Sequence, residues 1–338
     1  MSNRVRLAAG IVVSLVCTVL VVRGLNWEEA LTAISTADLG PALIAVPVLT
    51  SGLLFKSLRW QALFYPRTDV NLWRLLDALN IGYLVNNILP ARVGELVRPF
   101  VVRETGGPPY AWGLSTVIVE RVLDVITVVV VTLVVIAFLP VPNWLAAGAL
   151  AAGVVAIAGL AALIIAAGNE QAVVRLAARV LRRTPFASAT WLGRLAALIR
   201  GFAPLRVPRV MIPVVLWTVP LWSAPFLTFH LLLRSVGLEL PLVASVFAVC
   251  VIGLGVAAPS SPGQVGLFEG AGLIGLSAFT GDVERSVATV LLFHAYNYAI
   301  TSVFGVASLA RTGLSYRKVV ASVTLPAADG GPAEAIVP

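Results

Sequence analysis

The stretch NNILPARVGELVRP, residues 86–99, places two amides, two prolines and three charged side chains inside an otherwise mostly apolar chain. An ionisable side chain at the centre of a bilayer costs roughly 2.5 to 3.5 kcal/mol on insertion scales, so such side chains usually face a cavity or pair with one another. The three charged residues are Arg92, Glu95 and Arg98. We therefore expect this segment to handle a polar ligand.

The composition indicates an integral membrane protein. Apolar residues make up 59% of the 338 residues and charged residues 12%, and the mean hydropathy is +0.95, values that soluble globular domains do not reach. Six apolar runs approach the ~20 residues that cross hydrocarbon as a helix. The six predicted spans are residues 7–22, 39–55, 122–139, 144–167, 210–233 and 286–310. The first run has basic flanks and no cleavage pattern, which favours a retained signal anchor.

Two further apolar stretches, residues 75–89 and 242–258, end in polar and Pro/Gly breaks and are followed by short, partly apolar returns. Irregular backbone at membrane depth is tolerated only where protein or water satisfies its polar groups, so both breaks should line an interior cavity. The predicted fold is therefore an all-α polytopic membrane protein with about six full transmembrane helices and two re-entrant helical hairpins. The alternative is eight spans, in which both stretches cross as kinked helices.

An internal repeat relates the two breaks. Residues 90–94, PARVG, match residues 262–266, PGQVG, and the same offset of 172 residues superimposes the flanking spans. Span, hairpin and span therefore occur twice, over residues 39–139 and 210–310. Because the first copy begins outside and the second inside, the copies are predicted to be inverted, with a substrate site at the midplane between them.

The cations predict the topology, because Lys and Arg gather in short cytoplasmic loops. With a cytoplasmic amino terminus, most cations of the chain fall inside. They are Lys56, Arg59, Arg67, Arg74, Arg103, the arginines of residues 175–209, Arg311, Arg317 and Lys318. Both termini are predicted to be cytoplasmic. The net charge of +8 is then a product of topology, and nucleic acid is not an expected partner.

Residues 1–320 are predicted to form one membrane domain, with a basic cytoplasmic connection at residues 168–209. Within this connection, residues 171–183 and 191–202 pattern as basic amphipathic helices, which favours contact with the anionic cytoplasmic leaflet. Residues 321–338, rich in Ala, Gly and Pro, are typical of a disordered tail.

Each break also has the features of a helix start. Ser261 can act as an N-cap with Pro262 in the first turn and Gln264 completing a capping box. Asn86 or Asn87 can cap a helix that follows the first break. Two positive helix ends together with arginines favour an anion such as phosphate.

For Arg92, Glu95 and Arg98, which recur every three residues, an alternative interpretation is that they only neutralise one another and hold the hairpin, because paired charges inside a membrane also serve packing.

Two more groups carry possible chemistry. Glu120, Arg121 and Asp124 lie at the predicted start of a span, where they could gate the hairpin or merely complement a helix dipole. His294 could take part in a proton-coupled step with Glu269, or it could be a hydrogen-bonded packing residue. Asn297 lies one turn from the histidine.

Motifs of ordinary catalysis are missing from the sequence. Cys17 and Cys250 form no Cys-x-x-Cys pair, His230 and His294 belong to no His-Glu-x-x-His pattern, and no Walker loop or dinucleotide fingerprint occurs. We therefore predict no metal and no cofactor, and no complete enzyme site.

Three ordered motifs resemble the lysylphosphatidylglycerol synthase transmembrane-region family. They are Asn-x-x-Leu-Pro-x-Arg-x-Gly-Glu-x-x-Arg at residues 86–98, Glu-Arg-x-x-Asp at 120–124 and Pro-x-Ser-Pro-Gly-x-x-Gly-x-x-Glu at 259–269. The resemblance covers residues 4–317 and implies a flippase-like domain, although members are associated with different lipids. One departure is Gln264, where many relatives are expected to carry glycine. The other is the soluble aminoacyl-transferase domain, for which residues 321–338 leave no room, so we expect this chain not to be the complete synthase.

The resemblance and the residues together predict translocation of a phosphate-bearing lipid in the plasma membrane. Arg92 and Arg98 would bind phosphate, and Glu95 would orient them. The predicted substrate-binding residues are Asn86, Asn87, Arg92, Glu95, Arg98, Ser261, Gly263, Gly266 and Glu269, and the predicted gating or proton-coupling residues are Glu120, Arg121, Asp124, His294 and Asn297.

The cargo candidates are an anionic or aminoacylated phospholipid, a polyprenyl-phosphate-linked sugar and another isoprenoid lipid. Two other functions stay open: an intramembrane lipid hydrolase that pairs Glu95 or Glu120 with His294, and a membrane partner of a separate lipid-modifying enzyme.

Overall fold

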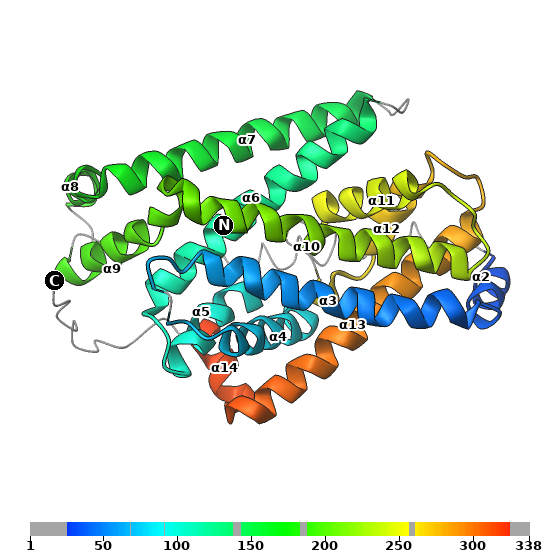
Figure 1. The fold of residues 1–338 in the computed structure, drawn as a ribbon, viewed down its shortest axis with the longest axis horizontal. Coiled ribbons are helices and arrows are strands. Elements are labelled where there is room, and N and C mark those ends of the chain that lie inside the picture. The colour runs from blue at the N-terminus through cyan, green and yellow to red at the C-terminus, as the bar shows by residue number, and fades with distance from the viewer. Residues whose placement is uncertain are drawn as a thin grey trace.

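The computed structural model describes residues 26–67, 69–90, 92–137, 143–182, 188–256 and 261–324, and this part of the chain is all-helical (Figure 1). Its helices, in chain order, are α2 (Trp27–Ser35), α3 (Leu39–Ala62), α4 (Leu72–Ile88), α5 (Gly94–Glu104), α6 (Tyr110–Ile136), α7 (Asn143–Gly168), α8 (Glu170–Val180), α9 (Ala189–Arg200), α10 (Pro208–Ser235), α11 (Leu242–Gly255), α12 (Leu267–Leu276), α13 (Val283–Thr312) and α14 (Tyr316–Thr324). Two short 3-10 turns, η2 (Ala203–Arg206) and η3 (Pro262–Gln264), complete the order.

Four of the described helices are long and apolar enough to cross a membrane: α3, α7 from Leu150, α10 and α13. Their outer faces carry large apolar side chains, and Leu43, Val155, Leu216 and Val303 are all more than 60% exposed. Apolar surface of this extent belongs against lipid rather than water. The prediction of an all-α polytopic membrane protein is confirmed.

The predicted count of six spans stays a prediction. The first, residues 7–22, lies outside the described residues. The one at residues 122–139 falls in α6, which is 27 residues long but carries Glu120, Arg121 and Asp124 in its middle. Charges at that depth are tolerated only when they face protein or a cavity.

Each of the two predicted hairpins is a pair of short helices that pack on each other, α4 with α5 and α11 with α12. These helices have 17, 11, 14 and 10 residues, fewer than the ~20 of a full crossing. The α4–α5 pair lies towards the left of Figure 1 and the α11–α12 pair towards the right. The two breaks therefore face each other near the middle of the molecule, as re-entrant hairpins require.

The order α3, α4, α5, α6 recurs as α10, α11, α12, α13. A shift of 172 residues reproduces the bounds of the second four helices to within five residues. In Figure 1 α3 and α10 run side by side in opposite directions. Inverted copies would give this antiparallel course of α3 and α10. The inverted repeat itself stays a prediction.

The hydrophobic core has two parts. One is built around Phe229, Phe247 and Leu276 of the second four helices, and the other around Trp60 and Ile81 of the first four. The first part also includes Ala45 of α3 and Val135 of α6, and the second includes Val214 of α10, so both parts draw on both sets of four helices.

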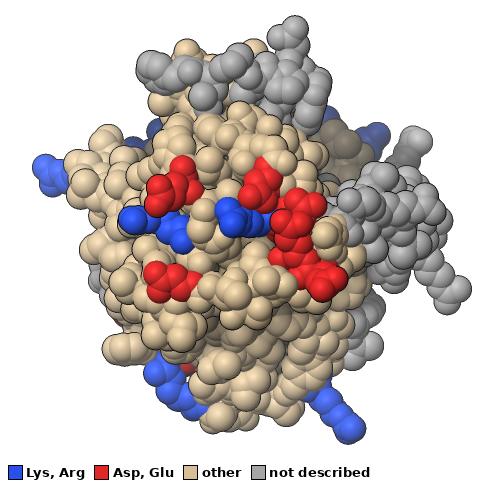
Figure 2. Space-filling view, turned by 90° about the vertical axis from the view of Figure 1, so that its right-hand side faces the viewer, with Lys and Arg blue, Asp and Glu red and all other residues tan. Residues whose placement is uncertain are grey.

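Charges divide the ends of the molecule. Figure 2 shows the end formed by α2 and the loops after α10 and α12, where acidic and basic side chains gather amid an otherwise uncharged surface. The residues of these segments are Glu28, Glu29, Asp38, Arg234, Glu239, Asp282, Glu284 and Arg285. Acids outnumber cations here, whereas α8 and α9 at the opposite end carry several arginines.

Lys56 and Arg59 differ from the topology prediction, which counted both as loop cations. Both lie inside α3, which continues to Ala62 instead of ending near residue 55. Their side chains are buried, so neither contributes to the loop count. The two predicted amphipathic helices are confirmed as α8 and α9, and the predicted tail lies largely outside the described residues.

Candidate functional site

The two hairpins meet at their tips. Arg92 Nη2 donates to Gln264 Oε1 at 3.4 Å, and these are the residues that the 172-residue repeat places in equivalent positions. Both adopt left-handed backbone conformations, with φ of 55° and 64°. Residues other than glycine rarely adopt this backbone region, and such backbone strain is typical of functional sites.

The first break is held by its two asparagines. Asn86 Oδ1 accepts the backbone N–H of Gly94, the first residue of α5, at 2.8 Å. Neither asparagine is the predicted cap of a helix through Pro90, because the helix begins at Gly94 and its N-cap residue is Val93, without a side-chain cap. Asn87 Nδ2 donates to Thr301 Oγ1 at 3.0 Å and to Ser302 Oγ at 2.9 Å. One amide therefore braces the start of α5, and the other ties the hairpin to α13.

The second break differs from its prediction. Ser261 and Gln264 form no capping box, because η3 is a single turn without a side-chain cap and the Gln264 side chain bonds Arg92. Gly263 and Gly266 have φ of 64° and 85°, which interrupts the helix. The second helix begins at Leu267, where Glu269 Oε2 accepts the backbone N–H of Gly266 at 2.6 Å.

Beneath the first tip lies a buried set of ion-paired charges, which we call the inner charge cluster. Its members are Lys56, Arg59, Arg98, Glu120 and Asp124, each at most 9% exposed. Arg98 grips Glu120 with both terminal nitrogens at 2.9 and 2.8 Å, and Arg59 bonds Asp124 at 2.6 Å. Lys56 lies 3.3 Å from Glu120 and 3.8 Å from Asp124, so it bridges the two pairs.

Three half-buried side chains extend this arrangement toward the tip, and we call them the outer charge cluster. Arg121 lies 3.4 Å from Glu95, and Arg92 lies 3.9 Å from the same carboxylate. The side chains of Arg121, Arg92 and Glu95 are 32%, 24% and 21% exposed. Arg121 also lies 3.3 Å from Glu120, which joins the outer cluster to the inner one.

The two clusters do not balance. They contain five cations, Lys56, Arg59, Arg92, Arg98 and Arg121, and three carboxylates, Glu95, Glu120 and Asp124. Burying unpaired charge is costly. The inner cluster has three cations and two carboxylates, and the outer cluster has two cations and one carboxylate, so each has one surplus positive charge. The surplus charge of the outer cluster is partly exposed, which gives this cluster the electrostatics of an anion site.

Two sequence expectations change here. Glu120 and Asp124 do not stand at a helix start, because α6 begins at Tyr110; the alternative that they only complement a helix dipole is wrong. Arg98 is 3% exposed, bonded to Glu120, with its guanidinium 4.0 Å from the Trp60 ring centre. Its predicted phosphate contact stays a prediction, but in this structure both terminal nitrogens bond Glu120.

Sequence reasoning missed Lys56 and Arg59 as members of the site. Their signal was present, since two cations three residues apart interrupt an otherwise apolar helix. Such cations need an acidic partner inside the protein, and the sequence could not show that the partners lie on α6.

A second polar group lies behind the second break. His294 Nδ1 is 2.5 Å from Glu269 Oε1, and its Nε2 is 2.8 Å from the carbonyl oxygen of Gly263. Phe268 stacks on the imidazole with ring centres 4.2 Å apart. The predicted proximity of His294 and Glu269 is confirmed, whereas Asn297 donates to Phe293 O within its own helix.

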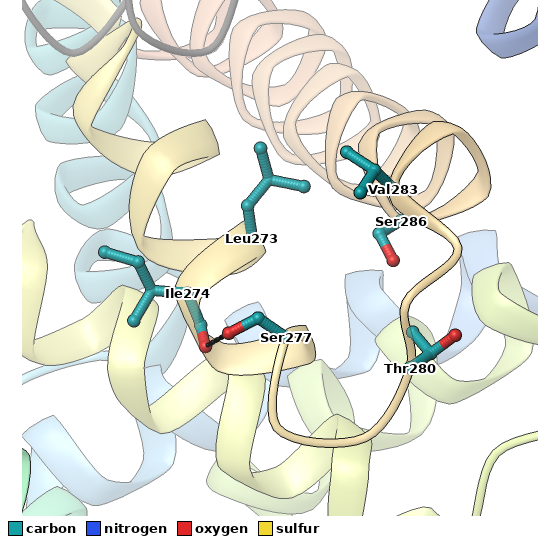
Figure 3. Close-up of a pocket in the computed structure, with 6 residues that line it drawn as sticks. All are labelled: Leu273, Ile274, Ser277, Thr280, Val283 and Ser286. Carbon is teal, nitrogen blue, oxygen red and sulfur yellow. Dashed lines mark hydrogen bonds between the residues drawn. The ribbon is translucent and has the colours of Figure 1, made fainter. Parts of the chain in front are cut away.

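A pocket of about 270 Å³ opens between α12 and α13 at the acidic end (Figure 3). It is lined by Leu273, Ile274, Ser277, Thr280, Val283 and Ser286. The serine hydroxyls donate to backbone carbonyls of their own helices or helix cap, so the pocket offers apolar surface and no free charge. In the described part of the chain, no group of His, Cys, Asp and Glu could hold a metal ion.

Comparisons with known proteins agree with a membrane protein of lipid metabolism. The sequence model of the family described as "Lysylphosphatidylglycerol synthase TM region" matches residues 7–305. "Glycosyltransferase AglD" of Haloferax volcanii is 26% identical over 367 residues, 94% of this chain and 56% of that protein. "UPF0104 membrane protein PH1989" of Pyrococcus horikoshii is 30% identical over 107 residues, 30% of this chain and 32% of that protein. The chain thus spans about half or less of the length of these relatives.

Proposed function

The chain belongs to the lysylphosphatidylglycerol synthase TM region family, and from this premise we propose that it moves a phosphate-bearing lipid between the leaflets of a cell membrane. One observation carries the proposal: five cations and three carboxylates meet at and beneath the tip of the first hairpin, and one of the two surplus positive charges belongs to the partly exposed outer cluster. A phosphate is the anion that membrane lipids offer such a site.

The outer charge cluster would receive the headgroup. Arginine binds phosphate with two parallel hydrogen bonds, and Arg92 and Arg121 both flank Glu95. A phosphate would compete with that carboxylate for their guanidinium groups. The inner charge cluster would hold α3, α5 and α6 in register beneath the headgroup, while the lipid tail stays among the apolar outer faces.

Movement would come from the two halves. One part of the core centres on the second four helices and the other on the first four, and among the described residues a long hydrogen bond from Arg92 to Gln264 links the hairpin tips. Rocking of one repeat against the other is how inverted-repeat transporters expose a midplane site to either side. We propose that this contact breaks and re-forms as the cavity opens to one leaflet and then the other.

The orientation is part of the proposal. The end that carries α8 and α9 would face the cytoplasm together with both termini, because cytoplasmic segments are enriched in Lys and Arg. The acidic end of Figure 2 would face outward. The membrane would be the plasma membrane, and the basic faces of α8 and α9 would lie on its anionic leaflet.

The alternative functions are distinguishable. A hydrolase that pairs Glu95 or Glu120 with His294 receives no support, because the polar contacts of His294 are Glu269 and Gly263. The relative named a glycosyltransferase favours a second candidate, in which the chain serves as the membrane partner of a lipid-modifying enzyme. That candidate predicts co-purification of an enzyme and no lipid exchange by the chain alone.

The test is lipid exchange in proteoliposomes. A labelled anionic lipid should change leaflet without changing mass, and Arg92→Ala should abolish exchange while the protein still folds. Arg92→Lys should restore only part of the activity, because an ammonium lacks the paired donors of a guanidinium. Arg285→Ala is the matched control, since Arg285 is half-exposed at the acidic end and pairs only with Asp282 at 3.7 Å.

Three results would contradict the proposal. Unchanged exchange by folded Arg92→Ala removes this arginine from the site. A lipid product of altered mass identifies an enzyme. No exchange by the wild type across anionic phospholipids and polyprenyl phosphates favours the partner role. Mass spectrometry of lipids that co-purify with the protein narrows the cargo in each case.

A further inference from the structure

The His294 ring faces two hydrogen-bond acceptors. Its Nδ1 lies 2.5 Å from the Glu269 carboxyl and its Nε2 lies 2.8 Å from the Gly263 carbonyl oxygen. A neutral imidazole has one N–H and one lone pair, so it can donate to only one of them. The arrangement needs one more proton, carried either as an imidazolium beside a carboxylate or as a neutral histidine beside a carboxylic acid.

Both forms have the same proton count and no net charge. The second Glu269 oxygen cannot supply the missing donor, because it accepts the backbone N–H of Gly266 at 2.6 Å. The Gly263 carbonyl is only an acceptor. The pair therefore holds a single proton that both residues share, and the side chains of His294 and Glu269 are 13% and 9% exposed, enough for proton exchange with water.

The other titratable groups around the pair have partners of their own. Tyr298 of α13 donates to the Asn87 carbonyl, and Tyr296 donates to the Ala42 carbonyl of α3. On α10, His230 pairs with Ser245. Arg92 is connected to the pair through one hydrogen bond and the chain, because it donates to Gln264, the residue after Gly263.

The elements that pack against α13 carry other charged groups. On α4, Asp77 pairs with Arg311 near the end of α13, and Arg74 donates to the Gly106 carbonyl. On α3, Lys56 and Arg59 pair with Glu120 and Asp124. The others are Glu28 and Glu29 in the first turn of α2 and Arg209 and Arg234 near the two ends of α10. The polar contacts of the His294 ring are Glu269 and Gly263, so these two residues hold the shared proton.

We infer that the Glu269–His294 pair is a proton-binding site that couples lipid movement to a proton. The inference deepens the proposed function and rests on it for the cargo, whereas the proton site stands on its own geometry. Histidine and glutamate inside membrane segments commonly serve as proton relays. No other described side chain pair has the same arrangement of one ring between two acceptors.

The consequence of losing the proton follows from the same geometry. Two acceptors would then face a ring with one N–H, and an unmade buried hydrogen bond is costly. Either the Gly263 carbonyl or the Glu269 carboxylate must move away. Gly263 belongs to the turn that presents Gln264 to Arg92, and Glu269 caps α12. Deprotonation would thus loosen the second hairpin tip and its contact with the first hairpin tip.

Spectroscopy tests the proton site without any lipid. The chain has only two histidines, so the protein labelled with ¹⁵N-histidine and reconstituted in phosphatidylglycerol and phosphatidylcholine vesicles gives two ring systems. In the His230→Gln variant, the only remaining ring signals are those of His294. We expect either two protonated ring nitrogens or, with a neutral ring, a carboxylic acid C=O band in infrared spectra that disappears in Glu269→Gln. A neutral ring beside an ionised Glu269 near neutral pH would overturn the inference.

Transport tests the coupling. In the same vesicles, loaded with labelled phosphatidylglycerol, an imposed pH gradient should change the rate of leaflet exchange in the wild type and in His230→Gln. Glu269→Gln keeps an acceptor for Gly266 but cannot carry the proton, so exchange should no longer respond to the gradient. A wild type that exchanges lipid with no response to the gradient overturns the coupling.

If the wild type exchanges no lipid at all, the proposed function fails, and the spectra still decide whether the proton site exists. If Glu269→Gln fails to fold, His294→Gln provides the same comparison, because it also removes the titrating ring while keeping a donor.

Discussion

Arg92 and Gln264 hold the hairpin tips in backbone conformations that cost a side-chain-bearing residue roughly 1–2 kcal/mol. Both equivalent positions have this unfavourable backbone conformation, and the two side chains form a hydrogen bond with each other. The sequence predicted the equivalence and singled out Gln264 as the departure from glycine. It could not predict the bond, because the repeat gives correspondence and not proximity.

Replacing Gln264 by glycine separates strain from contact. Gln264→Gly should raise thermal stability by up to roughly 1 kcal/mol, because the left-handed backbone then becomes free of strain. The same change should weaken lipid exchange, because Arg92 loses its partner across the tips. Thermal unfolding in detergent and exchange in vesicles measure the two effects. Gln264→Asn is the control, since asparagine tolerates this backbone but is shorter by one methylene. Lower stability of the glycine variant would contradict the strain argument.

Glu120 is the residue on which the inner charge cluster depends. Glu120→Gln leaves Arg98 and Lys56 without their shared carboxylate, and breaking a buried ion pair costs roughly 3–5 kcal/mol. The variant should therefore unfold at a distinctly lower temperature. The double variant Glu120→Gln with Arg98→Met should recover part of the loss, because it removes the orphaned charge. Equal loss in the single and double variants would show that Glu120 acts through other neighbours.

At the scale of elements, the two hairpins depend on close backbone contact. A Cβ at Gly94 would lie 1.9 Å from the Gly82 carbonyl oxygen, so α4 and α5 can pack only because both positions are glycine. The breaks themselves were predictable, since Pro, Gly and Asn interrupt apolar runs there. This packing was not, because a motif shows that a glycine is present and not what approaches it.

Gly94→Ala should open the first hairpin. The added methyl group must push the helices apart, which typically costs 1–3 kcal/mol in a packed interior. The added methyl group should also displace Asn86, whose Oδ1 accepts the Gly94 N–H. Thermal unfolding should show the loss. Gly159→Ala is the matched control, because nothing lies within 4 Å of a Cβ there, and alanine is the better helix former. Similar stability in both variants would contradict the close contact.

Two helix bounds could not be read from the sequence for a common reason. The α3 helix runs past residue 55 and α6 starts before residue 122 because the charges near those positions pair with each other across the fold. Taken along the chain, Lys56, Arg59, Glu120 and Asp124 resemble the ends of apolar segments. Long-range pairing turns them into interior residues, and no local pattern records it.

At the scale of the whole molecule, the charges of the two ends predict the orientation. Replace both native cysteines, Cys17 and Cys250, by alanine, and add a single cysteine at Glu28 or at Arg175. A membrane-impermeant maleimide should label the Glu28→Cys protein in intact cells and the Arg175→Cys protein only after permeabilisation, because α2 and α8 lie at opposite ends. The reverse pattern would invert the proposed topology, and labelling of both in intact cells would place both ends outside.

The all-α class, the pairs of short helices around the two breaks and the proximity of Glu269 to His294 could be predicted from periodicity, breaks and spacing. The surplus of positive charge could not be predicted from the sequence. It is summed over residues of α3, α5, α6 and the break between α4 and α5, and only the fold brings these residues together.

The single proton held between Glu269 and His294 has an electrical consequence. A lipid headgroup with one negative charge that crosses together with one proton carries no net charge, so the membrane voltage does no work on the pair, although it does about 2.3 kcal/mol per elementary charge at 100 mV. The difference in acidity between the two sides and the difference in lipid content between the two leaflets would then set the direction. A cell could collapse its voltage and still drive the cycle.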